Sequence, residues 1–169
     1  MGPNFMLLPA VALIPLLVGF VWYHPKVMGN AWMKETGMTE EKAQQGNMLV
    51  TFGFAYIFAL FASFALQGMV NHQMSILQLF LGQEGFGEAG SEMTKSYEAV
   101  MAIVGDRQLT FKHGAFHGVF YGIIIALPIL GTNALFEQKS WKYIFINVGY
   151  WMLTLGLMGG VLGQWGYNV

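Results

Sequence analysis

Residues Lys112–Glu137 read KHGAFHGVFYGIIIALPILGTNALFE, and this stretch decides the fold of the chain. Its two ends are charged, and no Asp, Glu, Lys or Arg lies between them. A segment this long and apolar can cross a bilayer as a helix, because a helix closes its own backbone hydrogen bonds and needs none from water. We therefore expect a transmembrane helix over residues 113–135.

Small residues recur at every fourth position of this helix and would form one narrow face. They are Gly114, Gly118, Gly122 and Ala126. Such a face lets a neighbouring helix approach until the two backbones nearly touch. Similar faces occur in two other apolar stretches, formed by Thr51, Ala55, Ala59 and Ser63 in one and by Gly149, Gly156, Gly160 and Gly163 in the other. We expect all three faces to serve in helix packing.

The composition is that of an integral membrane protein. Of the 169 residues, 55 % are apolar and 10 % are charged, whereas an average soluble domain has roughly 25 % charged residues. The mean hydropathy is +0.49. A formal net charge of −1 gives no basic excess that would attract nucleic acid. The absence of cysteine excludes disulfides and thiolate metal ligands.

Three further uncharged stretches complete an all-α, four-transmembrane-helix bundle, which we expect to form a single integral membrane domain over residues 1–169. The expected spans cover about residues 5–23, 48–69, 113–135 and 143–162. The first stretch lacks the basic start and the cleavage site of a signal peptide, and Pro9 and Pro15 should bend it. Five aromatic residues near the span ends are expected interfacial anchors, namely Trp22, Tyr23, Trp32, Trp141 and Trp165.

The first loop is expected to carry short interfacial helices. Asn30 could cap a helix over residues 31–36, and Gly37 is a suitable stop for it. Thr39 could cap a second helix that leads toward the next span.

The second loop, residues 71–111, is the longest extramembrane segment. Four glycines over residues 82–90 indicate a flexible turn. After it, Ser91 could cap an amphipathic helix that extends to Val104 and lies on the membrane or covers the mouth of the bundle.

The distribution of basic residues predicts the topology. Four spans place both termini on one side. The first and third loops hold five lysines, Lys26, Lys34, Lys42, Lys139 and Lys142, whereas the two tails hold no basic residue. The positive-inside rule then favours cytoplasmic first and third loops, with the termini outside.

Three patches of the chain together resemble a known family. They are GFVWYHPKVMGNAWMKETGMTEE (19–41), HGAFHGVFYG (113–122) and INVGYWMLTLGLMGGVLGQW (146–165). In order and spacing they are similar to the bacterial domain-of-unknown-function family 1761, a group of small four-span membrane proteins. Residues 71–111 are longer than is usual in that family. The resemblance implies a bacterial inner-membrane location, but no activity and no catalytic residues.

The only constellation of chemical interest consists of His72, His113 and His117. If the second and third spans are antiparallel, His72 and His113 lie near one membrane face and His117 lies one turn deeper. Histidines at positions i and i+4 of a helix can share a metal ion, and His72 could add a ligand or serve a bis-histidine haem. The simpler interpretation is that His113 lies at the membrane interface and that His117 donates a hydrogen bond between helices. On the sequence alone we predict no cofactor.

The spans contain few of the groups that a carrier or an enzyme would need. No ionisable group except histidine and tyrosine lies within them, although ion-coupled carriers usually keep one at membrane depth. Asn147, Tyr150, Thr154 and Tyr56 could line a modest polar path, but such residues more often bond between helices. No hydrolase motif is present.

The sequence therefore favours a non-catalytic membrane protein that acts by helix–helix association. The expected partners are the bilayer and either further copies of the chain or other membrane subunits, and not nucleic acid. The alternatives are a small pore or carrier for a neutral or amphipathic solute, and a histidine-bound metal or haem protein.

Overall fold

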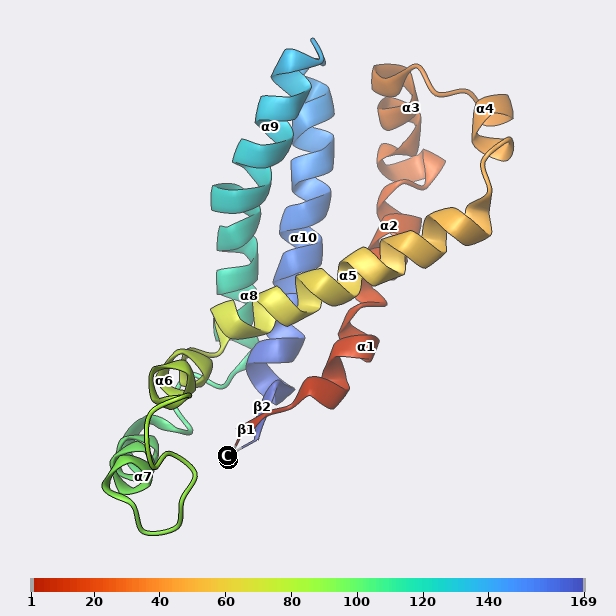
Figure 1. The fold of residues 1–169 in the computed structure, drawn as a ribbon. Coiled ribbons are helices and arrows are strands. Elements are labelled where there is room, and N and C mark those ends of the chain that lie inside the picture. Colours follow the sequence, from red (N-terminus) through yellow and green to blue (C-terminus); the bar gives the residue numbers. More distant parts are fainter. Residues whose placement is uncertain (1, 169) are drawn as a thin grey trace.

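The computed structural model describes residues 2–168, so Met1 and Val169, the ends of the expected domain, lie outside the described residues. Four of its helical stretches are long and apolar enough to cross a membrane, namely Phe5–Trp22, Met48–Val70, Phe111–Phe136 and Trp141–Trp165. The predicted all-α class with four spans is confirmed. Figure 1 shows the two chain ends together at one end of the bundle, where β1 (Gly2–Pro3) pairs with β2 (Tyr167–Asn168).

The first span is broken, as the prolines predict. A 3₁₀ turn, η1 (Phe5–Leu7), leads into α1 (Leu8–Val11), and α2 (Ile14–Trp22) follows after an interruption. Pro15 has no N–H to donate to the preceding turn, so the helix cannot run through this point undisturbed.

The first loop differs from expectation at Asn30. A π-helical turn, η2 (Pro25–Gly29), runs directly into α3 (Asn30–Thr36), so Asn30 is a helical residue and not a cap. The capping atom is Nδ1 of His24, which accepts a hydrogen bond from the Lys26 amide at 3.2 Å. Gly37 ends α3 with φ of +67°, as predicted. Thr39 caps α4 (Glu40–Gln44), also as predicted.

The remaining helices continue the bundle. They are α5 (Met48–Val70), α6 (His72–Phe80), α7 (Glu92–Val104), α8 (Phe111–Tyr121), η3 (Gly122–Ala126), α9 (Leu127–Phe136) and α10 (Trp141–Trp165). In Figure 1, α8, η3 and α9 follow one another end to end as one span that stands beside α10, whereas α5 crosses the bundle obliquely. Residues 48–54 of α5 are consequently exposed on every side, and a Cβ added at Gly53 would have no neighbour within 4 Å.

The glycine faces of α8 and α10 are packed backbone against backbone. A Cβ added at Gly114 would lie 2.9 Å from the Cα of Gly163, and one added at Gly118 would lie 2.9 Å from the Cα of Gly156. Gly159, which the spacing argument omits, also faces α8. Gly149 does not face α8; a Cβ there would lie 3.0 Å from the ring of Trp22 on α2.

The second small-residue face is only partly used within the chain. Ala59 and Ser63 are buried, whereas Thr51 is exposed because the N-terminal half of α5 leans away from the bundle.

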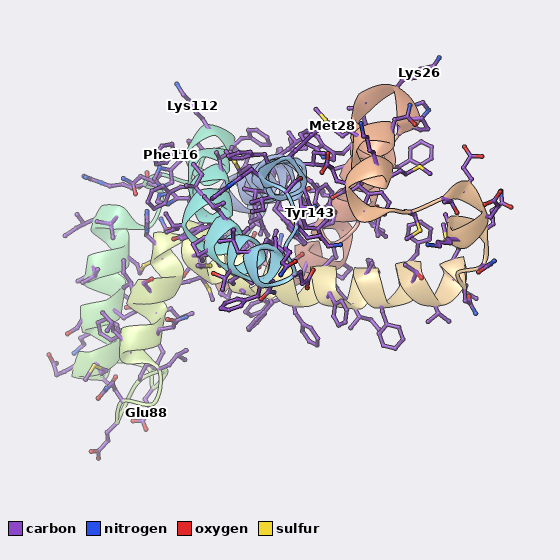
Figure 2. The ribbon with its side chains drawn as sticks, turned by 90° about the horizontal axis from the view of Figure 1, so that it is seen from above. Lys26, Met28, Glu88, Lys112, Phe116 and Tyr143 are labelled. Carbon is purple, nitrogen blue, oxygen red and sulfur yellow. The ribbon has the colours of Figure 1, made fainter. Side chains whose placement is uncertain are left out.

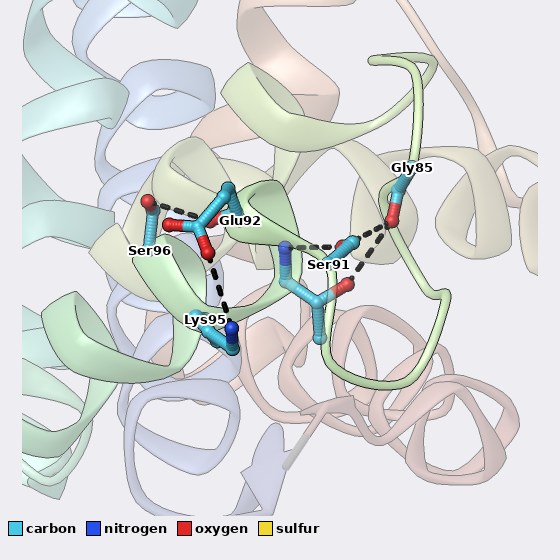
Figure 3. Close-up of polar contacts among 6 residues, drawn as sticks. Gly85, Ser91, Glu92, Lys95 and Ser96 are labelled. Carbon is cyan, nitrogen blue, oxygen red and sulfur yellow. Dashed lines mark hydrogen bonds and ion pairs between the residues drawn. The ribbon is translucent and has the colours of Figure 1, made fainter.

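Helices α6 and α7, with the loop between them, form the α6–α7 unit, residues 72–105. It projects from the side of the bundle with Glu88 at its tip (Figure 2). Polar side chains fold its glycine-rich loop onto the start of α7: the Ser91 hydroxyl donates to the carbonyl of Gly85 at 2.6 Å and accepts from the Thr94 amide at 3.1 Å (Figure 3). Ser91 is therefore the predicted cap of α7, and it also holds the loop.

Candidate metal-binding site

The three histidines singled out by the sequence lie together at the junction of α5, α6 and α8. His72 is the first residue of α6, directly after the extended residue Asn71 that ends α5 (φ −103°, ψ 99°). His113 and His117 lie one turn apart near the start of α8. Two separate elements thus contribute to one cluster.

Packing on both sides fixes this meeting point. Gly114 and Gly118 hold α8 against α10, and successive helical residues point about 100° apart, so the neighbouring histidines turn toward α5 and α6. Asn71 is buried, and its Nδ2 donates to the carbonyl of Leu162 on α10 at 3.2 Å.

A second buried amide lies on the other side of His72. Gln73 donates through Nε2 to the carbonyls of Gly105 and Arg107, at 3.1 and 2.8 Å, and so satisfies groups left free at the C-terminal end of α7. Neither Asn71 nor Gln73 is among the residues predicted for this site. The sequence signal that marks them is the run Asn71-His72-Gln73, in which an amide side chain stands on each side of a histidine at the end of a span.

The distances within the cluster are those of a potential metal site. The Nε2 atoms of His72 and His113 are 3.1 Å apart. One ring nitrogen from each of the three histidines can be chosen so that all lie within 4.8 Å of one another. Ligand nitrogens at about 2.1 Å from a tetrahedral ion are about 3.4 Å apart. The first pair is close to that spacing, and the full set of three nitrogens spans at most 4.8 Å.

The same distances do not fit the haem alternative. A bis-histidine haem needs its two axial nitrogens on opposite sides of the iron with the porphyrin plane between them. His72 and His113 are in hydrogen-bonding contact, and the His117 ring centroid is 4.5 Å from that of His113. No slot for a planar macrocycle separates these rings.

The surroundings of the cluster are aromatic and not acidic. The rings of Phe116 and Tyr121 pack on His117, with centroids 5.7 and 6.1 Å away. His72 is exposed and the other two histidines are half-buried, so an ion could enter from the membrane surface. Within residues 2–168, the ligand group consists of histidines alone and includes neither Glu98 nor Asp106.

Of the four polar residues suggested for a pore, three form hydrogen bonds with other helices. The hydroxyls of Tyr56 and Tyr150 donate to backbone carbonyls of the first span, at 3.1 and 2.9 Å. Asn147 accepts from Tyr23 at 3.0 Å. Thr154 is fully buried against its neighbours. These contacts join helices to one another, which lowers the support for a pore.

The expected aromatic anchors divide into two kinds. Trp141 and Trp165 are exposed near the ends of α10, at 62 and 56 % of their surface, as interfacial anchors should be. Trp22, in contrast, donates through Nε1 to the carbonyl of Ile146 at 3.1 Å. Tyr23 packs edge-on against Trp32, with centroids 5.6 Å apart. The Trp-Tyr pair of the first patch therefore fastens the first loop to α10.

Comparison with known proteins identifies a family for the chain. The family model described as "Protein of unknown function (DUF1761)" matches residues 9–163. No curated protein and no solved structure matches the chain.

Proposed function

Since the chain belongs to the DUF1761 family, to which no activity is assigned, we propose from its geometry that it is an integral membrane protein that binds one transition-metal ion through His72, His113 and His117. The observation that supports this proposal is the convergence of three imidazoles, from α6 and α8, within 4.8 Å. The simpler interpretation, hydrogen bonding between helices, accounts for the contact of His72 with His113, but it gives no reason for the position of the His117 ring beside them.

The donor set indicates which ions the site would take. Neutral imidazole suits Zn²⁺, Cu²⁺, Ni²⁺ and Fe²⁺, whereas Mg²⁺ and Ca²⁺ prefer oxygen ligands. Three protein ligands would leave one position of a tetrahedral Zn²⁺ ion for water or another ligand.

We assign the site a binding role and not a catalytic one. Ligating histidines usually donate their second ring nitrogen to a carboxylate or a carbonyl, which strengthens binding and orients the ring. In the described residues the side-chain hydrogen bonds of this trio are limited to the one between His72 and His113. An ion held without such outer partners should exchange readily, as in a protein that senses or passes on a metal.

A titration in detergent tests the proposal. Protein stripped of metal competes for Zn²⁺ with a chromophoric chelator, and we expect one ion per chain. Replacing His72, His113 or His117 by Ala should weaken binding by at least about tenfold, since even the loss of an outer partner costs 10–100-fold. His24→Ala is the matched control and should leave the affinity unchanged. Equal losses in all four variants, or in none, would contradict the proposal.

The exposed half of α5 favours a second role, association with another copy of the chain or with another membrane subunit. Thr51 belongs to a small-residue face that no helix of this chain covers over residues 48–54. The glycine faces of α8 and α10, in contrast, are occupied within the chain and cannot serve a partner.

Light scattering in mild detergent tests this second role. We expect an oligomer or a stable complex that Thr51→Phe disrupts and Leu49→Phe does not, because Leu49 is 85 % exposed and lies off the small-residue face. A monomer without partners would end this hypothesis. By the positive-inside argument we further propose that the lysine-bearing first and third loops face the cytoplasm of a bacterial inner membrane.

A further inference from the structure

The α6–α7 unit contains a pocket that has no part in the metal site. Its volume is about 440 Å³. Apolar and aromatic groups form most of its lining, and the residues that line it include Phe86, Tyr97, Met101, Ala102, Thr94 and Glu98. The pocket lies outside the four candidate spans, so water and solutes can reach it.

The walls of the pocket are held in place by the fold. The rings of Phe86 and Tyr97 meet almost at right angles, at 80° with centroids 5.3 Å apart. The Tyr97 hydroxyl lies 3.1 Å from that of Tyr167, and the Gly87 amide donates to Thr94 Oγ1 at 2.9 Å. The contacts of Ser91 and Thr94 with Gly85 in Figure 3 fix the loop that carries Phe86. A ligand would therefore meet a prepared corner of two aromatic rings.

The charge around the pocket is strongly negative. Residues 82–105 contain four glutamates and one lysine, a net charge of −3, while the whole chain has −1. Lys95 is engaged with Glu92 at 3.1 Å. Glu98 lines the pocket and is exposed, and none of the ion pairs found in residues 2–168 involves it, so its carboxylate is available to a ligand.

We propose that this pocket binds a small organic cation, an amine or quaternary ammonium ion with an apolar body. Aromatic rings attract cations through the negative charge of their faces, and a carboxylate beside them supplies the counter-charge. An anion would be repelled by the surrounding glutamates, and a neutral apolar molecule would gain nothing from Glu98. The proposal is independent of the metal site.

A pair of probes that differ in one atom tests the inference. Choline and its carbon isostere 3,3-dimethylbutan-1-ol have the same shape, but only choline carries a positive charge. Calorimetry uses the full chain in nanodiscs of phosphatidylglycerol, which has no choline headgroup. We expect choline to bind at least about threefold more tightly than the alcohol, by the usual strength of a cation–aromatic contact. Equal binding of the two probes, or no binding of choline, would overturn the proposal.

Two glutamate variants serve as a matched pair. Glu98→Gln and Glu88→Gln remove the same charge from the same unit, but Glu88 lies at the loop tip and does not line the pocket (Figure 2). We expect Glu98→Gln to weaken choline binding by at least about threefold and Glu88→Gln to leave it within error. Equal losses would mean that the field of the unit, and not the pocket, attracts the cation, and would overturn the assignment.

Discussion

Gly118→Ala should destabilise the bundle more than any other single-methyl change in the spans. The added Cβ would lie 2.5 Å from the carbonyl carbon of Leu155 and 2.9 Å from the Cα of Gly156, and both are backbone atoms that no rotamer change can move. Ordinary contact begins near 3.4 Å. The carbonyl oxygen of Leu155 would be closer still, so the two helices would have to part by about 1 Å or more along this closely packed seam.

The need to separate the helices determines how much stability the variant loses. Overpacking of a tight core costs about 1–3 kcal/mol. For a chain of this size each kcal/mol lowers the melting midpoint by about 2–4 °C, so we expect a decrease of about 2–12 °C. The assay is a thermal melt in mild detergent followed by circular dichroism.

Gly53→Ala is the matched control, because it adds the same methyl group to a helical glycine with open space around it. It should be neutral or stabilising by up to about 1 kcal/mol, since alanine favours the helix. The larger change Gly118→Leu should also lower the thermal stability more than His117→Ala, which only removes a half-buried ring. A Gly118→Ala protein that melts with or above Gly53→Ala would refute the claim that the glycine seam holds α8 to α10.

Two further predictions concern groups at the helix ends. Gln73→Met should lower the stability of the protein by about 1–3 kcal/mol, because it leaves carbonyls at the end of α7 unsatisfied. Gln67→Met should be nearly neutral, since the carbonyl of Gly166 that Gln67 binds keeps its hydrogen bond from the Asn4 amide at 2.8 Å. Thermal melts of the two variants check this order. Burial is the main cause that raises the pKa of the Tyr167 phenol above its usual value near 10, and the hydrogen bond to Tyr97 raises it further. Folding thus favours the neutral phenol, and its contribution to stability is present below about pH 10 and is lost as the pH rises further. Melts at pH 9 and pH 11 should differ less for Tyr167→Phe than for the unaltered protein, and an unchanged difference would show that this phenol contributes nothing.

Local chemistry made much of the fold predictable. Charge-free stretches of sufficient length mark the spans, Pro15 marks the break in the first one, and Thr39 and Ser91 mark helix starts, because each of these signals acts on its nearest neighbours. The family resemblance drawn from the three patches is likewise confirmed. The prediction that Asn30 caps a helix is wrong, because His24 caps a helical stretch that already begins at Pro25.

The features that were not predictable depend on packing between distant segments. Spacing alone placed Gly149 on the same face as Gly156, yet one face of a long helix meets different helices at different depths: Gly149 faces Trp22 and Gly156 faces α8. The oblique direction of α5, which leaves Thr51 uncovered, has no local signal. The sequence placed His72, His113 and His117 near one membrane face on the condition that the second and third spans are antiparallel, but it did not predict the extended residue Asn71 that lets α6 begin at His72. The pocket beside Glu98 depends on the fold of a glycine-rich loop, for which the sequence has no local signal.

The central claim is that three histidines hold one ion jointly, and X-ray absorption of the zinc-loaded protein tests it most directly. With one Zn²⁺ per chain, we expect three imidazole nitrogens at about 2.0–2.1 Å and one further ligand such as a water oxygen. His72→Ala should lower the number of imidazoles to two. A shell of oxygen ligands, or a spectrum that His72→Ala leaves unchanged, would contradict the account.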